Sequence, residues 1–348
     1  MTFFYMAGIM CNIVLTAIFF YIHWDFRLLV ENGFMLITFC FDLMMMSEAM
    51  FTSEDHFPLE ELKKVMWSFS DAEPRVFQRI HNDIQFLRYM RIFITVILVC
   101  CALFVFPITG DLREFVCIFY LFDDIKNRFW YPYFEFFILI MKMVLTLTFS
   151  CPIFIMLTVV QDNAYSLMLL RQKIRSIEEI FGTKEMWFQD RAYQRYVEVT
   201  LKRSIDEHIN IKRYNEIIAR IIKRETPAIF VIGVLLFTTF YFSVKMNMNN
   251  IVLMKSLFIV MLVILFTYLF IKVGQLLKDE SEDLYQDLCE CPWFLWNKHN
   301  KSLYLMFLIN SKKSLAVNSL NIDLDYSLIV RLAKTTMSLL TALQGLIE

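Results

Sequence analysis

The last 26 residues, DLDYSLIVRLAKTTMSLLTALQGLIE (323–348), are apolar enough to cross a bilayer, yet their first half contains Arg331 and Lys334. About 20 mostly apolar residues span a membrane as a helix, and ionised side chains inside a span normally face protein or water. Leucines mark one face of this segment. The opposite face, in steps of three or four residues, comprises Arg331, Lys334, Thr335, Ser338, Thr341, Ala342 and Gly345.

A spanning helix with one polar and one apolar face suits the wall of a water-filled pore. One helix does not enclose a pore, so this interpretation requires several copies of the helix around an axis. Three alternatives remain open. The cations snorkel to the inner interface, the helix lies flat on the membrane, or its small residues form a packing face.

Composition places the whole chain in a membrane. Hydrophobic residues make up 58% of the 348 and charged residues only 20%, against roughly half and a quarter in ordinary soluble domains. Only seven glycines occur, so a Gly-rich phosphate loop is not expected. The net charge of -1 gives no sign of a nucleic-acid partner.

Seven stretches have the length and apolarity of membrane spans, which predicts an all-α integral membrane protein with seven transmembrane helices. The predicted spans are 3–22, 33–51, 92–109, 134–160, 227–244, 251–273 and 325–346. We divide the chain into a bundle of spans one to four (1–160), a helical connection (161–226), spans five and six (227–273), an anchor segment (274–324) and a pore helix (325–348).

The distribution of Lys and Arg predicts the orientation of these spans. Connections 52–91, 161–226 and 272–304 together hold 23 of these cations, whereas the regions around 23–32, 110–133 and 245–255 hold six. Cations concentrate on the cytoplasmic side of membrane proteins. We therefore expect a cytoplasmic N-terminus and an extracellular C-terminus, the reverse of a G-protein-coupled receptor.

The connection 161–226 has the pattern of amphipathic helices. AYSLMLLRQKIRSIEEIFG (164–182) and YNEIIARIIKR (214–224) repeat apolar residues at i, i+3, i+4 and i+7. We expect spans four and five to continue below the membrane as a helical stem. The alternative is a basic helix lying on anionic lipid.

No catalytic motif is evident, and an enzyme is not expected. The five His are scattered, neither GxSxG nor HExxH occurs, and the acidic stretch KDESEDLYQD (278–287) is typical of a solvated face. Cys289 and Cys291 form a CxC without further ligands at metal-binding spacing, so we interpret them as reduced thiols. No cofactor and no metal are expected.

The C-terminal part resembles the insect odorant receptor family. LYQDLCECPWFLWNKHNKSLYLMFLINSKKSL (284–315) has the family's aromatic before a Trp, here Tyr285 and Trp293, followed by a short apolar helix that ends near Ser-Lys. DYSLIVRLAKTTMSLLTALQ (325–344) is similar to its closing helix, although Ser338 stands where many members have Tyr. The resemblance is specific over about the last 65 residues. Elsewhere it rests on span count, orientation and the long connection.

The resemblance implies a ligand-gated, non-selective cation channel in the plasma membrane of olfactory sensory neurons. Variable odorant-binding subunits form heterotetramers with a shared co-receptor, whose connection between spans four and five is much longer than 161–226. This chain is then a variable, tuning subunit. By position, the pore face includes Ser338, Thr341 and Gly345, and 303–309 is a cytoplasmic docking helix between subunits.

A ligand site in the outer half of the bundle is also implied, and it suits a small volatile of low polarity. The candidate residues are Phe34, Ile37, Thr38 and Phe41 from span two, Cys101, Phe104 and Ile108 from span three, Phe137, Met141 and Leu145 from span four, and Phe237 and Tyr241 from span five. A gustatory-type receptor channel, a G-protein-coupled receptor and a carrier remain as alternatives.

Overall fold

The computed structural model describes residues 2–23, 25, 27–30, 33, 36, 37, 40, 43, 72–104, 129, 131–179, 190–319 and 322–347. The described helices are α1 (Thr2–Ile22), α4 (Pro74–Phe104), α6 (Tyr131–Glu179), α7 (Arg191–Lys245), α8 (Asn250–Glu290), the 3-10 helix η3 (Trp293–Leu295), α9 (Lys298–Ser311) and α10 (Ser327–Ile347). The only strands among the described residues are β1 (Asn318–Ser319) and β2 (Ile322–Asp323), a two-residue antiparallel pair. The predicted all-α fold is confirmed.

Three helices are far longer than a membrane requires. α6, α7 and α8 contain 49, 55 and 41 residues. At a rise of about 1.5 Å per residue they extend roughly 60–80 Å, at least twice the hydrocarbon thickness of about 30 Å. α6 and α7 run unbroken from the predicted spans into the connection 161–226, as the expected helical stem requires.

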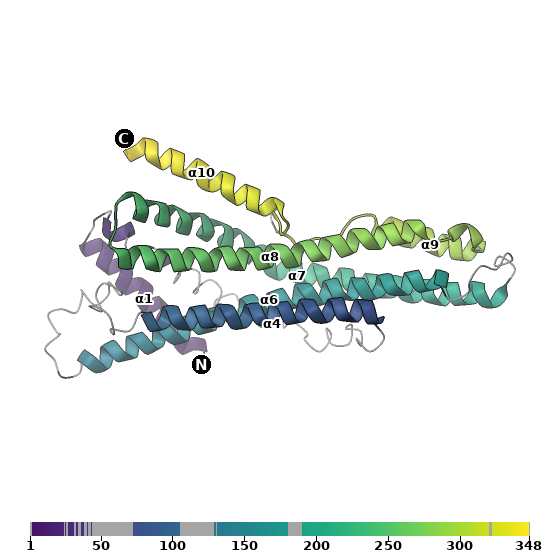
Figure 1. Cartoon of the computed structure of the whole chain (residues 1–348), viewed down its shortest axis with the longest axis horizontal. Helices are drawn as coiled ribbons and strands as arrows, with labels where there is room; N and C mark the ends of the chain where they lie inside the picture. The colour runs from purple at the N-terminus through teal and green to yellow at the C-terminus, as the bar shows by residue number, and fades with distance from the viewer. Residues whose placement is uncertain are drawn as a thin grey trace.

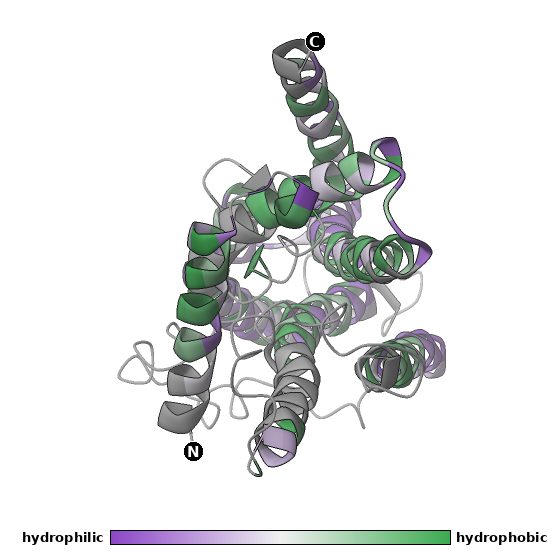
Figure 2. Cartoon of the chain, turned by 90° about the vertical axis from the view of Figure 1, so that its left-hand side faces the viewer, coloured by the Kyte–Doolittle hydropathy of each residue, from purple (hydrophilic) through white to green (hydrophobic). Residues whose placement is uncertain are grey.

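Figure 1 shows α4, α6, α7 and α8 running along the long axis of an elongated molecule, with α9 at one end and the C-terminus toward the other. We call the end that carries α9 the stem end and the opposite end the membrane end. α10 leaves the other helices at an angle from the middle of α8 (Figure 1). Viewed from the membrane end, α10 lies on the outer side of the bundle (Figure 2), where it contacts α7.

The core is densest where the stem helices meet. Leucine and isoleucine side chains at helical spacing on α6, α7 and α8 are fully buried there, namely Leu167, Leu170, Ile174, Leu201, Ile218, Leu277, Leu284 and Leu288. Toward the membrane end, by contrast, α8 exposes Met261, Ile264 and Tyr268. An apolar interior in one half and an apolar exterior in the other is the distribution that a helix bundle half immersed in lipid requires.

A buried ion network joins three helices in the stem. Arg171 of α6 donates from Nε to Asp287 Oδ2 of α8 at 2.8 Å, and it also pairs with Glu280. Arg175 binds the other oxygen of Asp287 at 2.7 Å, and Arg79 of α4 reaches Glu280 Oε1 at 3.0 Å. The Glu280 and Asp287 side chains are only 1% and 5% exposed, so these two carboxylates depend on the arginines for compensation.

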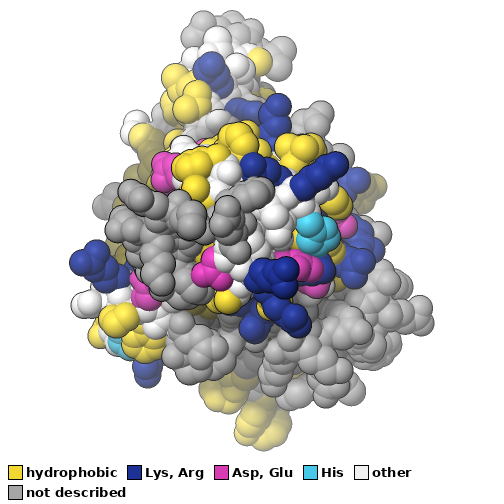
Figure 3. All heavy atoms as spheres, turned by 90° about the vertical axis from the view of Figure 1, so that its right-hand side faces the viewer, with side chains coloured by type: hydrophobic (Ala, Val, Ile, Leu, Met, Phe, Trp, Pro, Cys, Tyr) yellow, Lys and Arg dark blue, Asp and Glu magenta, His cyan; other side chains and the backbone are white. Residues whose placement is uncertain are grey.

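At the stem end, α9 is fixed to the start of α7. The indole Nε1 of Trp296 donates to Tyr193 Oη at 3.0 Å. Asn300 Nδ2 donates to Gln194 O at 2.8 Å, and Asn300 is fully buried. Lys, Arg, Asp and Glu side chains gather on the surface of this end (Figure 3).

The predicted spans correspond to described helices in most of the chain. Span one is α1, spans four, five and six lie in α6, α7 and α8, and span seven is α10. α4 covers span three as far as Phe104, and most of 33–51 and all of 105–109 lie outside the described residues. By length and apolarity, two described helical segments qualify as membrane spans, Ile153–Ile177 and Val252–Glu290, with shorter apolar helices at Met10–Ile22 and Phe230–Lys245.

Candidate functional site: the last helix and its contacts

The base of α10 is held against α8 by a close backbone approach. A Cβ added to Gly274 would lie 2.0 Å from the carbonyl oxygen of Leu324, a distance that no side chain tolerates. Next to it, Lys278 Nζ donates to Asp325 Oδ2 at 3.0 Å, and Tyr326 N donates to Gln275 Oε1 at 3.4 Å. We call these six residues the α8–α10 joint.

Asp325 also caps the N-terminus of α10. Its Oδ1 accepts hydrogen bonds from Ser327 N at 2.9 Å and from Ser327 Oγ at 2.5 Å. Carboxylates favour helix N-termini because they satisfy backbone N–H groups that have no partner within the helix. Asp325 thus serves two purposes, as the cap of α10 and as the partner of Lys278.

The two faces of α10 differ as the sequence predicts. Leu328 is buried, and Leu332 and Leu339 are half-buried on the side toward the bundle. The residues that the sequence assigns to the polar face are exposed, namely Arg331, Lys334, Thr335, Ser338, Thr341 and Ala342. Gly345 lies in α10, but its surroundings are outside the described part of the chain.

Near its C-terminal end α10 is bonded to α7. The Nε2 of Gln344 donates to Tyr241 Oη, across 103 positions of sequence. The Tyr241 ring meets Phe242 edge to face, and Phe242 is buried with Val30, Met248 and Val252. The hydroxyl of a predicted ligand-site residue therefore contacts the helix that was predicted to line the pore.

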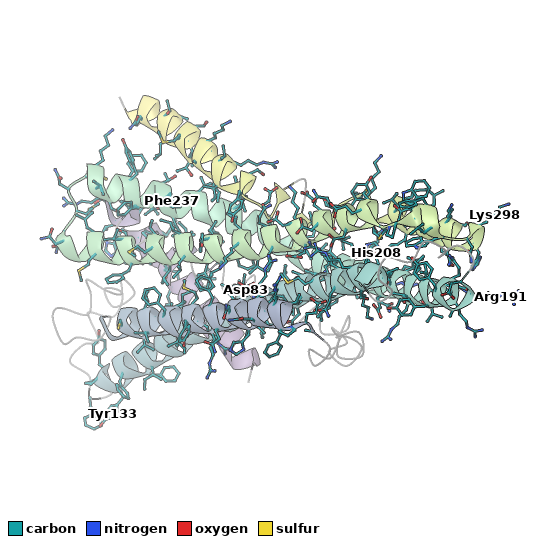
Figure 4. All side chains as sticks on the ribbon, turned by 45° about the vertical axis from the view of Figure 1, so that its right-hand side comes forward. Asp83, Tyr133, Arg191, His208, Phe237 and Lys298 are labelled. Atoms are coloured by element: carbon teal, nitrogen blue, oxygen red, sulfur yellow. The ribbon has the colours of Figure 1, made fainter. Side chains whose placement is uncertain are left out.

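The other predicted ligand-site residues are only partly described. Phe237 and Tyr241 are half-buried on α7, Ile37 is half-buried, and Phe137 of α6 is 60% exposed. Figure 4 shows Phe237 on the part of α7 that lies nearest α10. Four candidates have a helical backbone but side chains outside the described set, namely Cys101, Phe104, Met141 and Leu145. Four others lie wholly outside the described residues, namely Phe34, Thr38, Phe41 and Ile108.

Four residues of this site were missed by the sequence analysis, namely Gly274, Gln275, Lys278 and Gln344. Gln344 offered one signal, because an amide in an apolar, membrane-length segment requires a hydrogen-bond partner. Nothing in the sequence pattern indicated that the partner is Tyr241. The three residues on α8 lie just beyond the predicted sixth span. Polar residues are expected at that position, so their presence does not indicate a contact.

Within the described ranges, no three His, Cys, Asp or Glu side chains come together as metal ligands. Cys289 and Cys291 are free thiols, as interpreted from the sequence, and Cys291 is buried. The described part of the site offers apolar surface, hydroxyls, amides and fixed charges, which are groups that bind and position a ligand.

These features define a class of protein, a helical membrane protein with a stem and an outlying last helix. The family model described as "7tm Odorant receptor" matches residues 34–337, and the chain belongs to that family. This is a family of membrane receptors and ion channels, not of enzymes. The family resemblance proposed from the C-terminal sequence is confirmed.

Solved structures share the fold. The chain is similar to the olfactory receptor OR5 from the insect Machilis hrabei, with a TM-score of 0.72 and 12% identity over 98% of this chain and 87% of that one. A structure of the same receptor in complex with eugenol matches with a TM-score of 0.71 and 12% identity, covering 99% and 88% of the two chains. Comparison with curated protein sequences gave no match.

Proposed function

We propose that this chain is the odorant-binding subunit of a ligand-gated, non-selective cation channel in the plasma membrane of olfactory sensory neurons. A small volatile binds in the membrane half of the bundle and favours an open arrangement of α10. The observation that carries the proposal is the hydrogen bond from Gln344 to Tyr241, because it joins a wall of the predicted pocket to the predicted pore helix.

The ligand class follows from the chemistry of that wall. Phe237 and Tyr241 present aromatic surface with one hydroxyl, which suits a volatile of low polarity held by desolvation and shape. The eugenol complex of the Machilis hrabei receptor, which shares the fold, supports the same class. Tyr241 takes a different position in the closed and the open channel. A ligand that packs better against the open position shifts the closed–open equilibrium by the difference between its affinities for the two states.

The pore assignment is supported by the exposed face of α10. Ser338 and Thr341 face away from the bundle of their own chain, so copies of α10 around an axis would turn hydroxyls toward water. We place the partner subunit, an odorant co-receptor, at this axis and at the docking helix 303–309. There α9 exposes Leu305, Met306 and Ile309, which is apolar surface suited to a subunit contact in a heterotetramer.

The experiment is whole-cell recording during exposure to a panel of volatiles, with and without an insect odorant co-receptor. We expect a volatile-evoked cation current only on co-expression, and persistence of that current when G-protein signalling is blocked. Surface-expressed protein that never passes current with the co-receptor would contradict the proposal. A current abolished by G-protein blockade would instead favour the G-protein-coupled alternative.

The coupling role of Tyr241 has its own test, Tyr241→Phe, which keeps the ring and removes the hydroxyl. Loss of the bond to Gln344 changes the balance of closed and open states by about 1 kcal/mol, which is a shift of roughly fivefold in the half-maximal ligand concentration. The matched variant Gln344→Leu removes the other partner and should shift the concentration response in the same direction. Opposite shifts, or none, would argue against the coupling.

A further inference from the structure

The exposed face of α10 has two cations in its first two turns. Arg331 and Lys334 lie three residues apart and are both exposed, on the face that continues through Ser338 and Thr341. Leu328 and Leu332 lie on the bundle-facing side, and Lys334 lies roughly opposite them around the helix. Lys334 is therefore turned in the same direction as the proposed pore-lining hydroxyls, away from the bundle of its own subunit.

No carboxylate on the same helix pairs with Lys334, because α10 contains neither Asp nor Glu. Asp325 lies just before the helix, at its base. Both of its oxygens are engaged, Oδ2 with Lys278 and Oδ1 with Ser327. Among the residues that the structure describes, Lys334 makes no ion pair, so its charge remains available to act on ions nearby.

We infer that Lys334 lines the inner mouth of the pore and limits cation flow, most strongly for divalent cations. This inference rests on the proposed function and on the predicted cytoplasmic position of the first half of α10. A fixed positive charge raises the local potential, so cations become depleted at the mouth and conductance falls. A divalent ion experiences twice the energy of a monovalent one, and its depletion factor is therefore squared.

The first test is single-channel recording from patches that contain this chain and the co-receptor. Lys334→Gln should raise the unitary Na⁺ conductance about twofold, as expected for removing one charge roughly 10 Å from the ion path in water. The Ca²⁺ to Na⁺ permeability ratio, measured from reversal potentials, should rise as well. Lys334→Arg keeps the charge and should behave as the unsubstituted protein.

The matched control is Lys298→Gln. Lys298 is an exposed lysine at the stem end, at the far end of the molecule from the tip of α10 (Figure 4). Its neutralisation removes the same charge from the chain but leaves the pore mouth unchanged. Unitary conductance and permeability ratio should therefore stay at the values of the unsubstituted protein.

A second variant avoids any dependence on how Lys334→Gln folds. Lys334→Cys is treated from the cytoplasmic side, after assembly, with thiosulfonate reagents of opposite charge. The cationic reagent should restore the low conductance, and the anionic reagent should raise conductance above that of the glutamine variant. Because Cys289 is an exposed native thiol, the unsubstituted protein is treated in parallel.

The outcomes separate the two proposals. Volatile-evoked channels whose conductance and permeability ratio are the same in Lys334→Gln, and in Lys334→Cys with either reagent, would overturn the inference and leave the proposed function standing. Lys334 would then lie against lipid headgroups. Absence of any volatile-evoked current from the unsubstituted protein with its co-receptor would overturn both.

Discussion

Gly274 is the residue on which the α8–α10 joint depends. It lies on α8 against the backbone of Leu324, and a Cβ at this position would fall 2.0 Å from the Leu324 carbonyl oxygen. The overlap is with backbone, which does not move aside as the end of a flexible side chain does. The polar contacts of Lys278 and Gln275 then fix the direction in which α10 leaves α8.

We predict that Gly274→Ala displaces the base of α10 and removes volatile-evoked current. Surface expression should also fall, because forced overlap in a packed region costs typically 1–3 kcal/mol or more. The control is Gly233→Ala on α7, where the new Cβ would meet only Val263 Cγ1 at an ordinary 3.9 Å. Surface biotinylation measures the expression of both variants, and whole-cell recording measures their currents. Normal currents from Gly274→Ala would contradict the predicted overlap.

Single residues also show where sequence interpretation stops. The exposure of Ser338 and Thr341 was predicted, because helical periodicity assigns a residue to a face without knowledge of the neighbour. The bond of Gln344 was not predicted, because its partner Tyr241 lies 103 positions away and any hydroxyl in the bundle would have served equally. Periodicity predicts which face is buried, but it does not identify the residue that covers it.

Among the helices, α6 and α8 are held together in the stem by Arg171, which contacts Glu280, Asp283 and Asp287. The amphipathic pattern of 164–182 predicted the helix and its buried apolar face. The acidic stretch 278–287 was interpreted as a solvated face, and for Glu280 and Asp287 that interpretation is wrong, since both are buried. The pairing with α6 changes their environment, and a pattern read along one helix contains no information about the helix beside it.

We predict that Arg171→Met lowers the free energy of unfolding by about 3 kcal/mol, because it leaves two buried carboxylates without their main partner. The matched control, Arg203→Met on α7, breaks a surface pair with Glu207 in which the Arg203 side chain is 69% exposed. That change should cost less than about 1 kcal/mol. Melting temperatures of the detergent-purified variants provide the comparison, and equal losses would contradict the buried network.

A histidine in the contact between α7 and α9 predicts a pH dependence of stability. Burial lowers the pKa of His208 to about 4, with a smaller contribution from Lys212. Because the pKa is lower in the folded than in the unfolded chain, stability is full above about pH 6.5 and falls as the pH drops toward 4, by about 3 kcal/mol in all.

The corresponding measurement is the melting temperature between pH 7.5 and 5. The unsubstituted protein should melt at lower temperature as the pH falls below 6.5, and His208→Gln should flatten that decline. His81→Gln, at an exposed histidine of α4, should leave the decline intact. An equal slope in all three proteins would exclude His208 as the titrating group.

For the molecule as a whole, the sequence predicted the helical class, the family and the helical stem. It also predicted one apolar stretch of span length in each of the long helices α4, α6, α7 and α8. What it did not predict is the arrangement. The joint at Gly274 and the direction in which α10 leaves α8 (Figures 1 and 2) depend on contacts between segments that are distant in sequence. The orientation across the membrane stays a prediction, supported by the charged stem end in Figure 3.

Orientation is tested with an epitope after Glu348. We expect antibody to label intact, unpermeabilised cells, because α10 runs from the middle of the molecule toward the membrane end, away from the stem (Figure 1). An epitope inserted in the connection between α6 and α7, at residues 180–190, should label only after permeabilisation. The reverse pattern would invert the topology and leave the helix packing untouched.

The burial of Asn300 has a consequence for biosynthesis. Asn300-Lys301-Ser302 is a glycosylation sequon, and in the folded chain its amide is enclosed and bonded to Gln194. A chain inserted the wrong way round would present this tripeptide to the glycosylation machinery of the endoplasmic reticulum before α9 docks. The attached sugar would then prevent α9 from docking on α7. A misinserted subunit would therefore have a higher mass and an incomplete stem.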